Sequence, residues 1–191
     1  MRKTTKILGL AVALAAAPTL AFAHPGLHAA GFSDGFIHPF TGFDHLLAMV
    51  AVGYWAASMA GAARWAVPMS FLALMIAGGA LGFHAEAPAV IEYGIAASVV
   101  VLGGLVAFDV RLPVGPAAAL VGTFAFCHGF AHGAEAPNAA SGWHFGAGFV
   151  LATLLLQSLG LGLGALRLHR SVARIAGALI AASGCWFALN A

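Results

Sequence analysis

Two histidines and an aspartate lie within eight residues, in the segment HPFTGFDH at 38–45, directly before a long apolar run. Imidazole and carboxylate groups are borderline to hard ligands that suit Ni²⁺, Co²⁺, Zn²⁺ and Fe²⁺. We expect Pro39 to open a helix, with His38 at its N-terminal edge and Asp44 and His45 about two turns further in. Idle ionisable groups at the entrance of a membrane segment are costly. The motif therefore indicates metal or proton handling, and the alternative is a polar collar at the lipid interface.

A second motif, CHGFAHGAE at 127–135, ends another apolar run. His128 and His132 are four residues apart, so they share one face of a helix. Glu135 follows three residues later on that side and would be a third ligand or a partner of one. Cys127 lies about 100° around the helix from His128 and is expected outside the ligand set. The alternative is that these histidines reach toward the lipid interface.

Five further candidate residues lie elsewhere in the chain. Glu92 occupies the apolar segment AVIEYGIAASVV, and a carboxylate inside a membrane segment indicates a function by default. His24 and His28 lie near the N-terminus expected after processing and would help to capture an ion. His84 and Glu86 fit a functional site and a solvated loop equally well.

The composition indicates that the solvent of this chain is a bilayer. Of its 191 residues, 62% are hydrophobic and 7% are charged, whereas a soluble domain carries about 25% charged residues. Because lipid cannot satisfy backbone polar groups, we expect an all-α polytopic membrane helix bundle. The net charge of +2 gives no support for nucleic-acid binding, and two cysteines form neither a disulfide framework nor a CxxC site.

The first 23 residues have the three-part pattern of a secretory signal peptide. Arg2, Lys3 and Lys6 precede an apolar stretch, which closes on the small-residue site Ala-Phe-Ala at 21–23. Cleavage there would make His24 the new N-terminus, with a free α-amine beside its imidazole. The alternative is an uncleaved first membrane helix. We expect residues 1–23 to be the signal peptide and 24–191 to form a single six-helix transmembrane domain.

Six spans are expected after the leader: 43–63, 65–84, 89–109, 113–132, 143–166 and 171–189. A cleaved leader puts the mature N-terminus on the periplasmic side of the cytoplasmic (inner) membrane. Every remaining arginine then falls at a cytoplasmic link, as the positive-inside rule requires. Eight of the nine histidines fall on the opposite, outer side, which predicts an outward-facing cation site. Gly129 and Gly133 are expected to leave room for a neighbouring helix.

The segments HPFTGFDHLLAMVAVG, CHGFAHGAE and IEYGIAASVV together resemble the HupE/UreJ family. Its members are small membrane proteins linked to nickel-dependent hydrogenases and ureases, and they are thought to be nickel permeases. The resemblance covers the whole mature chain. It implies nickel-enzyme maturation proteins as partners, and as metal contacts it implies His38, Asp44, His45, His128, His132 and Glu135. The first motif also resembles the H-x4-D-H signature of the nickel/cobalt transporter family, but here five residues separate His38 from Asp44.

We therefore expect a transporter rather than an enzyme, with Ni²⁺ as the ion and Co²⁺, Zn²⁺ or Cu²⁺ as alternatives. Ligand type alone does not select nickel, because most N/O sites bind copper more tightly. Histidine ligands must lose their protons, so binding is expected to weaken below about pH 6. Gln157, Ser98 and Asp109 are candidates for an exit path. The rival interpretations are an intramembrane metal-dependent hydrolase and a non-transporting metal-binding accessory or sensor protein.

Overall fold

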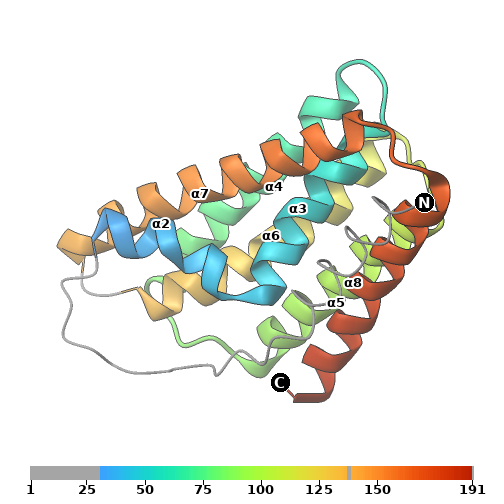
Figure 1. Cartoon of the computed structure of the whole chain (residues 1–191). Coiled ribbons are helices and arrows are strands. Elements are labelled where there is room, and N and C mark those ends of the chain that lie inside the picture. The colour runs from blue at the N-terminus through green and yellow to red at the C-terminus, as the bar shows by residue number, and fades with distance from the viewer. Residues whose placement is uncertain (1–30, 137–138, 191) are drawn as a thin grey trace.

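A computed structural model describes residues 31–136 and 139–190, and these residues form helices without any strand (Figure 1). The all-helical prediction is confirmed. The helices are α2 (Phe32–Thr41), α3 (Phe43–Ala57), α4 (Ala63–Gly82), α5 (Ala89–Ala107), α6 (Val114–Glu135), α7 (Ala139–Ala165) and α8 (Arg170–Asn190). The predicted leader at 1–23, together with His24 and His28, lies outside the described residues.

Five of these helices, α4 to α8, are long and apolar enough to cross a membrane. The chain is thus a polytopic membrane helix bundle. The span expected at 43–63 is shorter than predicted, because α3 has 15 residues and a length of about 22 Å, against a hydrocarbon core of about 30 Å. The chain turns early after Ser58, whose hydroxyl donates to the carbonyl of Trp55. Gly61 then adopts the left-handed conformation, with φ of 58°.

The prediction that Pro39 opens a helix is wrong. Pro39 lies inside α2, and the break in the chain comes three residues later at Gly42. Gly42 is extended (φ −89°, ψ 112°), and it ends α2 and begins α3. A Cβ at this position would lie 3.0 Å from atoms of both Asp44 and His45. The break therefore places the two halves of the first motif on different helices.

The helices pack mainly in pairs: α4 against α6, α5 against α8, and both α2 and α3 against α7 (Figure 1). The first pair makes direct backbone contact. A Cβ on Gly129 would overlap the backbone of Met75, and one on Gly133 would overlap that of Gly79. These glycines leave room for a neighbouring helix, as predicted, and their contact holds the histidine-bearing turns of α6 against α4.

From α3 to α8 the helices alternate in direction, so the two histidine motifs lie at one end of the bundle and the arginines at the other (Figure 1). At the arginine end, a cavity of about 810 Å³ opens between the ends of α3, α5, α7 and α8. All five arginines of the described residues line it: Arg64, Arg111, Arg167, Arg170 and Arg174. The charge segregation expected from the sequence is therefore present in the fold.

Candidate metal site

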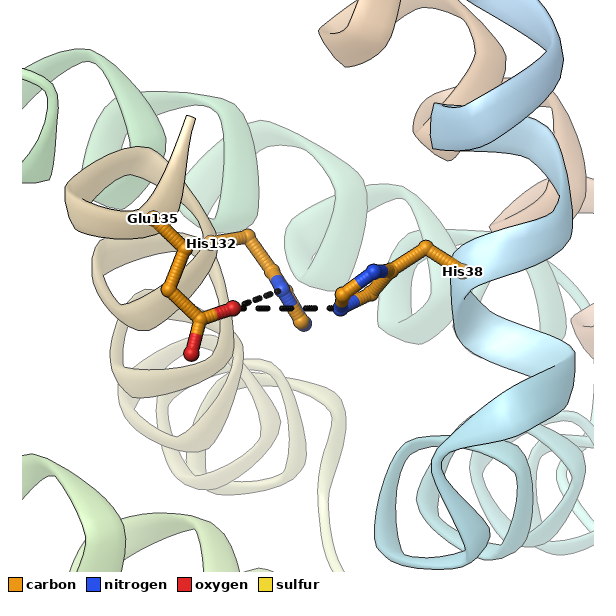
Figure 2. A group of neighbouring side chains, drawn as sticks. All are labelled: His38, His132 and Glu135. Carbon is orange, nitrogen blue, oxygen red and sulfur yellow. Dashed lines mark ion pairs between the residues drawn. The ribbon is translucent and has the colours of Figure 1, made fainter. Parts of the chain in front are cut away.

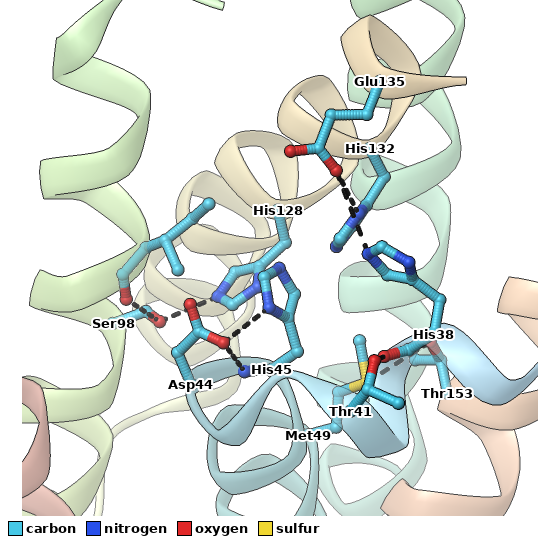
Figure 3. A network of polar contacts seen from close by, with 11 residues as sticks. His38, Thr41, Asp44, His45, Met49, Ser98, His128, His132, Glu135 and Thr153 are labelled. Carbon is cyan, nitrogen blue, oxygen red and sulfur yellow. Dashed lines mark hydrogen bonds and ion pairs between the residues drawn. The ribbon is translucent and has the colours of Figure 1, made fainter. Parts of the chain in front are cut away.

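Four imidazole rings meet at the histidine end (Figure 3). His38 comes from α2, His45 from the first turns of α3, and His128 and His132 from successive turns of α6. The ring centres are 4.7 Å apart for His38 and His132, 4.2 Å for His132 and His45, and 4.7 Å for His45 and His128. The two motifs, separated by more than 80 residues in the sequence, thus form one continuous row of imidazoles.

Asp44 orients the ring of His45. Its Oδ1 atom lies 2.7 Å from Nδ1 of His45 and also accepts the backbone N–H of His45 at 2.8 Å. An ionised carboxylate can only accept, so Nδ1 carries the proton and Nε2 keeps its lone pair. A histidine held by a carboxylate in this way is the arrangement typical of a metal ligand.

Ser98 orients His128 from the neighbouring helix α5. The serine hydroxyl donates its single proton to the carbonyl of Ile95 at 2.6 Å. It must therefore accept from Nε2 of His128, which lies 2.9 Å away. Nδ1 of His128 is then the atom with the free lone pair. Asp44 and Ser98 thus leave each neutral imidazole with one nitrogen available to a ligand.

At the outer end of the row, the partly exposed side chains of His38 and Glu135 lie beside the buried ring of His132 (Figure 2). Oε2 of Glu135 lies 3.9 Å from Nε2 of His38 and 3.8 Å from Nδ1 of His132. These distances are too long for hydrogen bonds. One ligand atom from each of the three residues lies within 4.8 Å of the others. An ion placed between them would bring one carboxylate and two imidazoles into its coordination shell.

Several nitrogens of the row are buried without a hydrogen-bond partner. They are Nε2 of His45, Nδ1 of His128 and both ring nitrogens of His132. These residues are only 8%, 0% and 6% exposed. Leaving a buried polar group unpaired costs about 1–3 kcal/mol, and native structures rarely tolerate it without reason. Each neutral imidazole has one lone pair, and a bound cation would engage it, whereas no neighbouring protein group among the described residues does so.

Aromatic rings close the row on the side of α7. The ring of Phe149 lies 4.3 Å from that of His132, and the ring of Phe145 lies 5.6 Å from that of His38. Burial lowers the pKa of His38, and the neighbouring His45 lowers it further, whereas the carboxylates of Glu135 and Asp44 act in the opposite direction. The neutral imidazole that a metal ion requires is therefore favoured.

The other described candidates from the sequence are not members of the row. Glu92 is exposed in the first turn of α5, outside the group formed by His38, His132 and Glu135, but it is close enough to interact electrostatically with Glu135 and Asp44. His84 lies in the turn after α4, with its ring against Phe83. Cys127 packs beside an apolar cluster formed by Ile91, Ile95 and Ala131, which agrees with its expected place outside the ligand set.

Sequence reasoning identified the imidazoles and Asp44, but it did not identify Ser98 as the group that orients His128. Ser98 was expected on an exit path, and the structure places its hydroxyl against His128 instead. No spacing rule links residues 98 and 128, because their contact depends on how α5 and α6 pack. A usable signal did exist, since a serine inside the apolar run IAASVVVL needs a polar partner within the bundle.

The chain is similar to known proteins over nearly its whole length. The family model described as HupE / UreJ protein matches residues 11–187. The chain is 46% identical over 185 residues to Protein HupE of Rhizobium leguminosarum bv. viciae, which covers 95% of this chain and 96% of that protein. No solved structure matches the chain.

Proposed function

The chain belongs to the HupE/UreJ family, and we propose that it carries a divalent transition-metal ion through the membrane, entering at the histidine end. Ni²⁺ is the proposed ion, with Co²⁺, Zn²⁺ and Cu²⁺ as competitors. The observation that carries this proposal is the set of unpartnered, buried imidazole nitrogens in one row. The family is associated with hydrogenase and urease accessory functions, so the proposed recipients are maturation proteins of nickel enzymes.

The row of imidazoles supports stepwise movement of the ion. Glu135 and His38 are the most exposed members, with side chains that are 62% and 37% exposed, and would capture the ion first. His132 is next to both His38 and His45, so it would pass the ion inward to the deeper ligands. Two carboxylates, Asp44 and Glu135, balance the two positive charges, which matters because an unbalanced charge away from water is costly.

The proposed direction of transport follows from the charge at the two ends. We propose that the leader 1–23 is removed, that the histidine end faces the periplasm and that the arginine end faces the cytoplasm, in accord with the positive-inside rule. Glu92, His24 and His28 are proposed to help attract cations to the histidine end. A mass spectrum of the purified protein tests the processing, since the mature chain is expected to begin at His24.

Flux of ⁶³Ni²⁺ into proteoliposomes tests the function. The purified protein should admit the ion faster than empty liposomes, and His38→Ala and His132→Ala should abolish the difference. His169→Ala is the matched control, because His169 is exposed at the arginine end. Nickel binding without flux would contradict transport and favour a binding accessory protein. Unchanged flux in both histidine variants would contradict the assigned entry site.

A second candidate is an intramembrane metal-dependent hydrolase, and one observation favours it. An apolar cavity of about 590 Å³ between α4, α6 and α7 has His132 in its wall, so a lipid-soluble substrate could approach the row. A hydrolase must keep its ion, with one coordination position open, whereas a carrier must release it. Zinc that stays bound through prolonged dialysis, together with ester hydrolysis lost in His132→Ala, would favour the enzyme.

A further inference from the structure

A second group of donor atoms lies beneath the row of imidazoles. The hydroxyl oxygen of Thr153 on α7 lies 3.4 Å from the sulfur of Met49 on α3 and 3.7 Å from the sulfur of Met75 on α4. Thr153 and Met49 are fully buried and Met75 is 3% exposed. Figure 3 draws Met49 and Thr153 together with the histidines. Three helices thus direct one oxygen and two thioether sulfurs to the same place.

The distances in this group suit a shared ion. The hydroxyl of Thr153 also lies 2.9 Å from the carbonyl of Phe149, a stronger acceptor than sulfur, so its proton goes there. The two sulfurs then face the lone pairs of the hydroxyl oxygen. With metal–sulfur and metal–oxygen bonds of about 2.3 and 2.1 Å, two ligands lie about 3.1 Å apart at a right angle and about 3.6 Å apart at the tetrahedral angle. The observed separations are close to this range.

This group of donor atoms lies about one helical turn further along the bundle than the row of imidazoles. Met49 lies one helical turn beyond His45 on α3, and Thr153 lies one turn beyond Phe149, whose ring contacts His132. One further turn along α7 is Gln157, which is 3% exposed. Both polar atoms of its amide are buried without a hydrogen-bond partner. An unpaired amide at this depth is costly, and a passing cation would satisfy its carbonyl oxygen.

We infer that Met49, Met75 and Thr153 form a second, deeper metal site through which the ion passes toward Gln157. This inference rests on the proposed function and extends it from entry to passage. Thioether sulfur is a soft ligand that binds soft and borderline transition metals well and hard cations such as Mg²⁺ and Mn²⁺ poorly. The deeper site therefore rejects the hard divalent cations that the carboxylates of the entry site would admit.

The test separates binding from passage. Met49→Leu/Met75→Leu removes both sulfurs at nearly constant volume, a change that cores tolerate well. We expect ⁶³Ni²⁺ flux to fall at least tenfold, while equilibrium nickel binding stays within about twofold of the wild type. Thr153→Val and Gln157→Leu should behave likewise. Met59→Leu is the matched control, since Met59 is buried but lines the arginine-end cavity. Wild-type flux in the double variant would overturn the inference, and so would a parallel loss of binding and flux.

A second measurement tests the deeper site without depending on transport. Cu⁺, held reduced, prefers thioether sulfur, and its binding can be measured without any flux. In a Cys127→Ser/Cys185→Ser/His132→Ala background, which lacks both free thiols, Cu⁺ should still bind, and adding Met49→Leu/Met75→Leu should lower its affinity at least tenfold. If wild-type protein moves no nickel but this Cu⁺ pattern holds, the proposed function fails and the deeper site stands. Cu⁺ binding that is indifferent to both methionines would overturn the deeper site.

Discussion

At the histidine end, four imidazoles lie against one another inside the bundle; at the arginine end, five guanidinium groups surround an open cavity. The histidines are mostly buried, and Asp44 and Ser98 orient their rings. The arginines are exposed, and among the described residues the only acidic partner is Asp109, 4.0 Å from Arg111. At the histidine end the polar groups thus contact one another, and at the arginine end they face water.

This difference indicates what each end does. Burial and fixed orientation of imidazoles are costly, and they are useful where a ligand must be bound. Exposed cationic side chains at helix ends need no partner, and they satisfy the charge bias that orients membrane proteins. The same substitution can therefore be made in a residue of the same type at each end. In such a matched pair, only the variant at the histidine end should have altered metal binding.

His132→Ala should have the largest effect, because His132 is the one ring that contacts both His38 and His45. We expect nickel affinity to fall by about 100-fold or more, since losing even an outer partner of a metal ligand costs about 10–100-fold. Isothermal titration of detergent-purified protein measures this. His169→Ala, at the arginine end, should bind as the wild type does. Equal losses in the two variants would remove the distinction between the ends.

Asp44→Asn should come next. The amide no longer requires a proton on Nδ1 of His45, so the lone pair at Nε2 is no longer secured, and affinity should fall about 10–100-fold. Asp109→Asn provides the control, because Asp109 has φ of 50° and asparagine tolerates that conformation. The same titration measures both proteins. Wild-type affinity in Asp44→Asn would show that Asp44 does not orient a ligand.

Ser98→Ala should have a smaller effect. It removes the acceptor of Nε2 in His128 and leaves a buried N–H unpaired, at a cost of about 1–3 kcal/mol. We expect roughly a tenfold loss of affinity and a lower thermal midpoint, measured by fluorescence-detected unfolding. Ser70→Ala is the control, since the hydroxyl of Ser70 donates to a backbone carbonyl. If both serine variants bind equally well, Ser98 has no role in orienting His128.

A change of pH should have the smallest effect near neutrality. Because burial and His45 lower the pKa of His38 from its reference value of about 6.5, less than half of His38 is protonated at pH 6.5. Its contribution to nickel affinity should therefore fall less than about twofold between pH 7.5 and 6.5 and more steeply below. The wild type and His38→Ala, titrated in parallel, isolate this contribution. A larger loss above pH 6.5 would contradict a lowered pKa.

How far the sequence predicted the site depended on how local the contacts are. The spacing of His128, His132 and Glu135 places them on one helix face whatever the tertiary fold, so their grouping was predictable. The break at Gly42 was not, because Pro39 is a common helix-opening residue and only the packing of α2 along α7 places it inside a helix. As a result, the position of His38 relative to His45 was predicted wrongly although both residues were identified.

For the residues of the deeper site, too, only the local signals could be read from the sequence. Gln157 was identified as a polar residue in an apolar helix, a local signal that needs no fold. Met49 and Met75 gave no signal, since methionine is an ordinary core residue. Only the arrangement of α3, α4 and α7 brings the two sulfurs to Thr153. The charge separation of the two ends was predictable because it depends only on the number and direction of the helices.

X-ray absorption at the nickel edge, on protein loaded with one equivalent of Ni²⁺, tests most directly whether the histidine end binds the metal ion. We expect a first shell that contains more than one imidazole, with metal–nitrogen distances of about 2.0–2.1 Å and a weaker imidazole signal in His132→Ala. His169→Ala should give the wild-type spectrum. A first shell of oxygen atoms alone, unchanged in His132→Ala, would contradict metal binding by the histidine end.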